Sequence, residues 1–216
     1  GHGADIDPWA FADAWRAEYD PAMAPIRDGT RPYVPLDDLH MENLGRLLAR
    51  RGRDGALTAA ARAELNRAWE RLPPWPDTGA ALTRLKAQHI VAPCSNGSIA
   101  LMTRLARFAG LPWDCILGAE IARSYKPRPE VYLVSCAALR LPPAEVMMVA
   151  AHNGDLAAAR AAGLRTAFFP RPAEHGPGQA TDLAPAADWD VVARDMTDLA
   201  DRLSRGPITA GHFSDN

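Results

Sequence analysis

The sequence predicts an α/β fold with a parallel, doubly wound sheet, preceded by an all-helical region. From about residue 79 onward, short apolar runs alternate with helix-length stretches, which is the pattern of βαβ units. The apolar runs are nearly continuous, as expected for strands covered by helices on both faces. A proline-rich break at residues 73–79, PPWPDTG, separates this region from the helical one before it.

The region before the break is expected to contain helices only. Apolar residues recur there at spacings of three and four in residues 9–19, 36–51 and 58–72. Turn residues lie between these stretches, at residues 28–35 and 51–55. We therefore expect a helical domain over residues 1–74 and an α/β domain over residues 75–216.

Five strands and four helices are expected after the break. The apolar runs that predict strands cover residues 89–95, 115–120, 145–151, 164–170 and 189–193. The helices are expected at residues 79–88, 98–109 and 129–139, and after Asp155. In such a sheet, ligands bind at the carboxyl ends of the strands, so we look for chemistry there.

Composition indicates a globular protein with a small-molecule partner. The chain has 216 residues, 48% of them hydrophobic, and a formal net charge of −2, so it has no basic excess for nucleic acid or an anionic membrane. Its three cysteines, Cys94, Cys115 and Cys136, lack zinc-type spacing and suit a reducing compartment. With neither a signal peptide nor an apolar run of about 20 residues, we expect a soluble, cytoplasmic protein.

Polar side chains gather at three predicted strand ends. Ser95 and Asn96 follow the first strand, Lys126 stands before a proline, and His152 and Asp155 follow the third strand. Each has an ordinary structural explanation alone: a turn, a solvated lysine, a hydrogen-bonded histidine. Together they offer a hydroxyl, an amide, an ammonium group and a carboxylate at one sheet edge, which suits an anionic substrate and a carboxylate nucleophile.

These motifs resemble the haloacid dehalogenase superfamily. Ser95 and Asn96 in CSNGS, Lys126 in YKPRPEVY and Asp155 after VAAHNG look like its second, third and fourth motifs. The chain is similar to a type II (L-)2-haloacid dehalogenase along nearly its whole length, including ARAAGLRTAFFPRP after Asp155. The resemblance implies a Rossmann-like core, with Pro8–Leu72 as a helical cap domain.

The resemblance implies hydrolytic dehalogenation of short 2-haloalkanoic acids. An aspartate attacks the halogen-bearing carbon, halide leaves, and water hydrolyses the resulting ester. Lys126 would keep the nucleophile ionised. Ser95 and Asn96 would bind the substrate carboxylate, and Asn96 is also placed for halide. Asp155 would orient Lys126 and position the hydrolytic water.

Three further residues are candidates. Tyr132, six residues after Lys126 as in the family, would return towards the site. Arg16 follows a tryptophan in a segment that aligns with the family cap, which implies that it receives the halide. His152 stands where many members have asparagine; as a hypothesis, it would donate to the substrate or act as a base in ester hydrolysis.

Asp155 is the single acidic residue of the fourth motif. Superfamily phosphatases hold Mg²⁺ with a second acid four or five residues later, where this chain has Ala159 and Arg160. We therefore expect no metal and no other cofactor. Two alternatives remain: a Mg²⁺-dependent phosphatase of the same superfamily, and a non-catalytic binding or scaffold protein.

The first family motif is not found. In the family, the nucleophilic aspartate lies in an apolar-D-x-x-G-T segment before the cap, and nothing before Pro8 resembles it. Asp5 and Asp7 mimic a phosphatase DxD pair, but we expect them to lead into the first helix. We therefore expect that the nucleophile belongs to an N-terminal segment missing from this sequence. Family members are often homodimers, so we also expect a homodimer.

Overall fold

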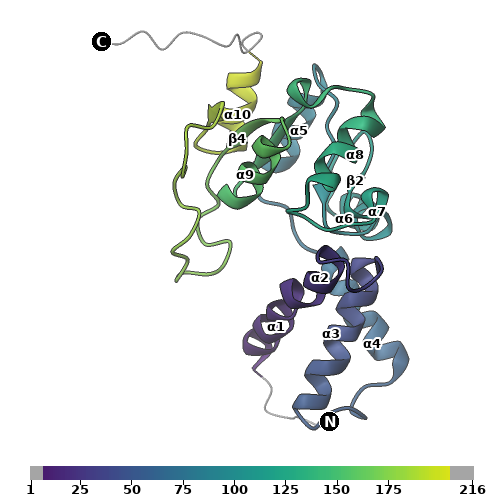
Figure 1. The fold of residues 1–216 in the computed structure, drawn as a ribbon. Helices are drawn as coiled ribbons and strands as arrows, with labels where there is room; N and C mark the ends of the chain where they lie inside the picture. Colours follow the sequence, from purple (N-terminus) through teal and green to yellow (C-terminus); the bar gives the residue numbers. More distant parts are fainter. Residues whose placement is uncertain (1–6, 205–216) are drawn as a thin grey trace.

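A computed structural model describes residues 7–204, and it shows a helical part and an α/β part (Figure 1). The elements of the helical part are α1 (Pro8–Ala17), α2 (Tyr19–Arg27), α3 (Leu36–Arg50), α4 (Ala59–Asn66) and the 3₁₀ helix η1 (Arg67–Glu70). The Asp7 carboxylate caps α1 by accepting from the Trp9 amide at 2.9 Å. Asp7 therefore leads into the first helix as predicted, whereas Asp5 lies outside the described residues.

The α/β part alternates helices and strands as the sequence predicts. Its helices are α5 (Thr78–Lys86), α6 (Ile99–Ala109), α7 (Ala119–Ala122), α8 (Pro129–Leu139), the 3₁₀ helix η2 (Pro143–Glu145), α9 (Asn153–Ala161) and α10 (Met196–Leu203). Its strands are β1 (Cys94–Ser95), β2 (Leu117–Gly118), β3 (Met147–Ala150), β4 (Arg165–Phe168) and β5 (Val191–Val192). The α/β class with parallel strands is confirmed.

Hydrogen bonding divides the strands into two sheets within residues 7–204. Strands β3, β4 and β5 form one parallel sheet, and β1 pairs in parallel with β2 in another. We expected one continuous sheet, but β1 and β3 do not pair with each other in this part of the chain. Strand β1 is shorter than its apolar run because Pro93 lacks an amide hydrogen for a ladder.

Glycine is required at one strand end of the smaller sheet. Gly118 pairs with Ser95 and has a φ of 119°, a conformation that other residues rarely adopt. A Cβ atom at Gly118 would clash with the backbone of Ser95. The small residue thus lets β2 approach the strand end that carries a predicted site residue.

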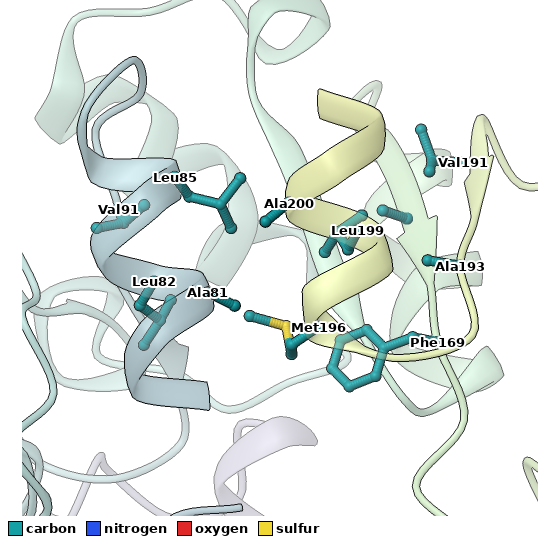
Figure 2. Close-up of a cluster of buried hydrophobic side chains, with 11 residues drawn as sticks. Ala81, Leu82, Leu85, Val91, Phe169, Val191, Ala193, Met196, Leu199 and Ala200 are labelled. Carbon is teal, nitrogen blue, oxygen red and sulfur yellow. The ribbon is translucent and has the colours of Figure 1, made fainter. Parts of the chain in front are cut away.

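The core of the α/β part lies between helices and strands on both sides of the larger sheet. Figure 2 shows side chains of α5 meeting those of α10, β5 and Phe169 in one buried cluster. A second cluster joins α8 and α9 to β3 and β4 and includes Tyr132 and Phe168, both fully buried. Helices pack on both faces as a parallel sheet requires.

A third cluster fixes the helical part against the α/β part. It combines Met23 and Leu39 of α2 and α3 with Ala119 and Tyr125 of the α/β part, all almost fully buried. The Tyr125 hydroxyl also donates to the Val34 carbonyl at 2.7 Å. This apolar contact holds the helices over the strand ends. None of the helices in residues 7–204 has both the length and the apolar character needed to span a bilayer.

Candidate active site

Lys126, Asp155 and Tyr132 form the centre of the candidate site. The Lys126 ammonium group lies 2.6 Å from Oδ2 of Asp155, and the Tyr132 hydroxyl donates to Oδ1 at 2.5 Å. The ion pair is mostly buried, with 19% of the lysine and 13% of the aspartate side chain exposed. Both carboxylate oxygens of Asp155 are therefore occupied by strong donors.

Local structure explains why these side chains meet. Asp155 lies in the first turn of α9, directly after β3, where the helix dipole favours a negative charge. Tyr132 comes from the first turns of α8, and Pro129 starts that helix. Lys126 precedes the helix across a cis peptide bond to Pro127. The predicted return of Tyr132 towards Lys126 and Asp155 agrees with this geometry.

Burial and the neighbouring anion raise the pKa of Tyr132. The phenol loses hydration inside the core, and the Asp155 carboxylate next to it disfavours a second negative charge. The pKa therefore lies well above the ordinary value for tyrosine. Tyr132 stays protonated at neutral pH and acts as a hydrogen-bond donor to Asp155.

Asn96 connects this cluster to the helical part. Its Oδ1 accepts from the backbone amide of Lys126 at 2.9 Å, and its Nδ2 donates to the Tyr19 hydroxyl at 3.1 Å. The side chain is largely buried. The neighbouring Ser95 hydroxyl oxygen accepts from the Gly97 amide at 2.9 Å, so its own hydrogen can still be donated to a ligand.

A cavity of about 180 Å³ lies where the helical part meets the strand ends. Its lining residues include Arg16, Tyr19, His40, Trp69 and Ser95. One water needs only about 10–15 Å³ of such space, so the cavity has room for a short organic acid. A larger hollow of about 350 Å³ beside α6 is lined by none of the predicted site residues, whereas the smaller cavity is lined by Arg16 and Ser95.

Arg16 is the cation of this cavity. Its guanidinium group lies over the Tyr19 ring, 4.0 Å from the ring centroid. Within residues 7–204 no hydrogen bond or ion pair engages the Arg16 side chain, although the residue is exposed. Its donors are therefore available to an anion in the cavity. The halide-receiving role of Arg16 stays a prediction.

His40 lines the same cavity and was not predicted as a site residue. It is 4% exposed, stacks on Trp69 with centroids 4.6 Å apart, and has an Nδ1 atom without a partner. Burial lowers the pKa of His40 to about 4, so the ring is neutral at pH 7. The available signal was a polar residue on the apolar face of α3, next to Leu39 and Leu44.

His152 is held away from the Lys126–Asp155 contact. Its Nε2 lies 3.1 Å from Oε2 of Glu174, a loop residue. The hydrogen bond to Glu174 raises the pKa of His152 above its ordinary value, and burial partly opposes that shift. Hydrogen bonds join Lys126 to Asp155 and Asn96, and Asp155 to Tyr132. His152 has no hydrogen bond to any of these four residues and interacts with Asp155 only as a nearby charge.

Asn153, the residue after His152, anchors the loop that follows β4. Its Nδ2 and backbone amide both donate to Asp182, and its Oδ1 accepts from the Trp189 indole at 2.9 Å. The loop between β4 and β5 thus depends on the tip of β3 for its position. Asn153 therefore has a structural role, because it positions the loop between β4 and β5.

The positions where a phosphatase would have its second acid are used for packing. Ala159 is fully buried in the cluster between α8 and α9. The Arg160 guanidinium group stacks on Trp189 at 4.4 Å and bonds to Asp188 at 3.1 Å. These residues offer no oxygen ligand for Mg²⁺, which prefers carboxylates and water.

Comparisons with known proteins agree with this geometry. The family model of haloacid dehalogenase-like hydrolases matches residues 8–163. Among curated proteins, (S)-2-haloacid dehalogenase 4A of Burkholderia cepacia is 29% identical over 62% of this chain and 61% of its own length. The (S)-2-haloacid dehalogenase of Xanthobacter autotrophicus is 32% identical over 50% of this chain and 44% of its own length. The chain thus spans less than two thirds of these relatives.

Solved structures give matches over most of the chain. The defluorinating L-2-haloacid dehalogenase Rha0230 is 50% identical with a TM-score of 0.91, covering 94% of this chain and 83% of that one. The L-2-haloacid dehalogenase PA0810 is 48% identical with a TM-score of 0.90, covering 94% and 87%. Because the family model matches well over half of the sequence, the chain belongs to the haloacid dehalogenase-like hydrolases.

Proposed function

We propose that the protein hydrolyses the carbon–halogen bond of short 2-haloalkanoic acids, without a metal, through an ester on an aspartate. The observation that carries the proposal is the unpaired guanidinium group of Arg16 in a small cavity beside Ser95. A reaction that binds one anion and expels another needs separate donors for each. The four named relatives above are all called 2-haloacid dehalogenases.

In this proposal the substrate carboxylate binds at the end of β1. The Ser95 hydroxyl and the remaining amide hydrogen of Asn96 donate to it. The halogen then points towards Arg16, whose weakly hydrated, permanently charged group receives the departing halide. Helices α1–α4 and η1 act as a cap, consistent with the domain division at residue 74.

Asp155 supports the reaction as a positioning residue. Both of its oxygens already accept strong hydrogen bonds, from Lys126 and Tyr132, and such bonds reduce their nucleophilicity. These bonds argue against Asp155 as the attacking carboxylate. The proposal takes that group to lie outside residues 7–204, because no apolar-D-x-x-G-T motif occurs within them, with Lys126 keeping it ionised. This assignment stays a prediction, as does the homodimer, which light scattering of the purified protein would test.

The proposed steps balance as follows. A carboxylate oxygen of the nucleophile forms a bond to C2 of the substrate while the carbon–halogen bond breaks and halide leaves with the electron pair. Water then attacks the carboxylate carbon of the ester, the ester bond breaks, and a 2-hydroxy acid leaves. One proton per turnover passes to solvent. His152 stays a hypothesis for the second step.

Turnover in water enriched in ¹⁸O tests both the reaction and the nucleophile. We expect halide release in the presence of EDTA and ¹⁸O in one carboxylate of the protein, located by peptide mass spectrometry outside residues 7–204. Label on Asp155 would overturn its positioning role. Phosphate release from small phosphomonoesters that EDTA abolishes would favour the phosphatase alternative, and release of neither anion would favour a non-catalytic protein.

A further inference from the structure

His152, Glu174 and His175 form a cluster of metal-type ligands apart from the Lys126–Asp155 pair. One ligand atom from each of the three side chains lies within 4.8 Å of the others. Nε2 of His152 lies 3.1 Å from Oε2 of Glu174. The rings of His152 and His175 are nearly parallel, at 14°, with centroids 6.1 Å apart.

These separations are close to those of a bound transition metal. With bonds of about 2.0–2.2 Å, two ligands of a tetrahedral zinc ion lie roughly 3.3–3.6 Å apart. The ligand atoms are at most 4.8 Å apart, so no pair has to approach by more than about 1.5 Å. His152 and Glu174 are 46% and 29% exposed, so their side chains have room for that movement.

The donor types select the class of cation. Two imidazoles and one carboxylate are the ligand set of three-ligand zinc sites, in which water fills the open position. Mg²⁺ and Ca²⁺ prefer oxygen ligands and bind imidazole poorly. The cluster therefore suits Zn²⁺ and its transition-metal neighbours.

The ligands come from two segments that are distant in the sequence. His152 stands between β3 and α9, and Glu174 and His175 stand in the loop between β4 and β5. Ala173, directly before them, has a φ of 65°, which is unfavourable for alanine. An ion held by all three would join this loop to the turn that carries Asp155.

We propose that His152, Glu174 and His175 bind a divalent transition-metal cation such as Zn²⁺, which clamps the loop between β4 and β5 to the start of α9. The site is separate from the proposed dehalogenation, which needs no metal. It adds to the hydrogen bonds that Asn153 makes with Asp182, Ala184 and Ala186 of the same loop. Zn²⁺ concentration thereby controls the mobility of this loop.

Calorimetric titration of the full-length protein with Zn²⁺ at pH 8 tests the site. We expect the wild type to bind one more equivalent than His175→Ala, and Glu174→Gln to bind that equivalent at least tenfold more weakly. Exposed His89, which is outside the cluster, provides the matched control His89→Ala, expected to keep it. His2 and His212 lie outside the described residues, and any binding they contribute is common to all variants.

Amide hydrogen exchange tests the clamp itself. We expect Zn²⁺ to slow exchange in residues 170–185 of the wild type and not of His175→Ala. Equal Zn²⁺ binding by the wild type, His175→Ala and Glu174→Gln would overturn the site. Binding of the extra equivalent without slower exchange would overturn the clamp, and displacement of Zn²⁺ by equimolar Mg²⁺ would overturn the assignment of the cation.

Discussion

The charged side chains on the two sides of the candidate site differ in whether they form an ion pair. On the α/β side, Lys126 and Asp155 neutralise each other at 2.6 Å and are mostly buried. On the helical side, no ion pair engages Arg16 within residues 7–204; its guanidinium group lies over the Tyr19 ring and acts on Asp20 only as a nearby charge. A paired charge holds a fixed geometry, and an unpaired one is available to a ligand. The α/β side is thus organised to position groups, and the helical side to receive an anion.

Breaking the paired side should have the largest effect. Lys126→Met removes the cation that keeps the nucleophile ionised, so we expect kcat for halide release to fall by about 10³-fold. It also leaves the Asp155 carboxylate without its charged partner, at a cost of about 1–3 kcal/mol in the free energy of unfolding. Steady-state kinetics and urea denaturation measure the two effects.

The sequence contains one other lysine, which provides the control. Lys86 is paired with Asp114 at 2.7 Å on the surface, away from the candidate site. Lys86→Met should leave kcat unchanged. An equal loss of activity in both variants would mean that Lys126 acts through general stability and not at the site.

Removing the unpaired cation should have the second largest effect. Arg16→Met takes away the halide-receiving group, and we expect kcat to fall by about 10²-fold, as when one charge-stabilising donor is removed. Stability should change little because Arg16 is exposed and unpaired. Arg27→Met is the matched control, since Arg27 is on α2 and already paired with Asp20 at 2.7 Å. Full activity of Arg16→Met would contradict the comparison.

The buried His40 makes the helical side sensitive to acid. Its pKa is about 4 in the folded protein and about 6.5 when unfolded. The unfolded chain therefore gains a proton first, and stability is lost as the pH falls from 6.5 to 4. The loss amounts to about 3 kcal/mol.

Denaturation at pH 4.5 and pH 7.5 measures this effect. We expect His40→Phe to lose less stability between the two pH values than the wild type, because its ring does not titrate. His89→Phe, at an exposed histidine, should behave as the wild type. Identical pH dependence of the wild type and His40→Phe would show that the ring is not buried in neutral form.

The smallest effect is expected at His152. Its ring is hydrogen-bonded to Glu174 and to neither Lys126 nor Asp155, so His152→Asn, assayed with EDTA, should lower kcat by less than about tenfold. Unchanged turnover would remove the hypothesis of a base in ester hydrolysis. A loss as large as that of Lys126→Met would mean that His152 changes partner when substrate binds.

Much of this arrangement could be predicted from the sequence. Continuous apolar runs predicted the parallel strands, and polar residues at strand ends predicted that Lys126 and Asp155 lie at one edge of the sheet. That placement follows from parallel topology, because neighbouring strands end at the same edge. Tyr132 was expected near Lys126 and Asp155 only from the family resemblance. The separation of β1 and β3 into two sheets was not predicted, since an apolar run does not specify its hydrogen-bonding partner.

Residues whose role depends on packing between distant segments were not predicted. His40 has the spacing of a core residue on α3, and its position in the cavity depends on how the helices pack against the strand ends. Glu174 lies in a loop without periodicity, so its pairing with His152 could not be inferred. Asn153 follows the same strand end as His152, and its use as a loop anchor depends on contacts with Asp182 and Trp189, which are distant in the sequence.

The central claim is that Lys126 on the α/β side and Arg16 on the helical side act in one metal-independent site. Halide release from 2-chloropropionate by the full-length protein in EDTA tests this claim most directly. The account predicts chloride release by the wild type, about 10³-fold less by Lys126→Met and about 10²-fold less by Arg16→Met. No chloride release by the wild type, or release that requires added Mg²⁺, would contradict it.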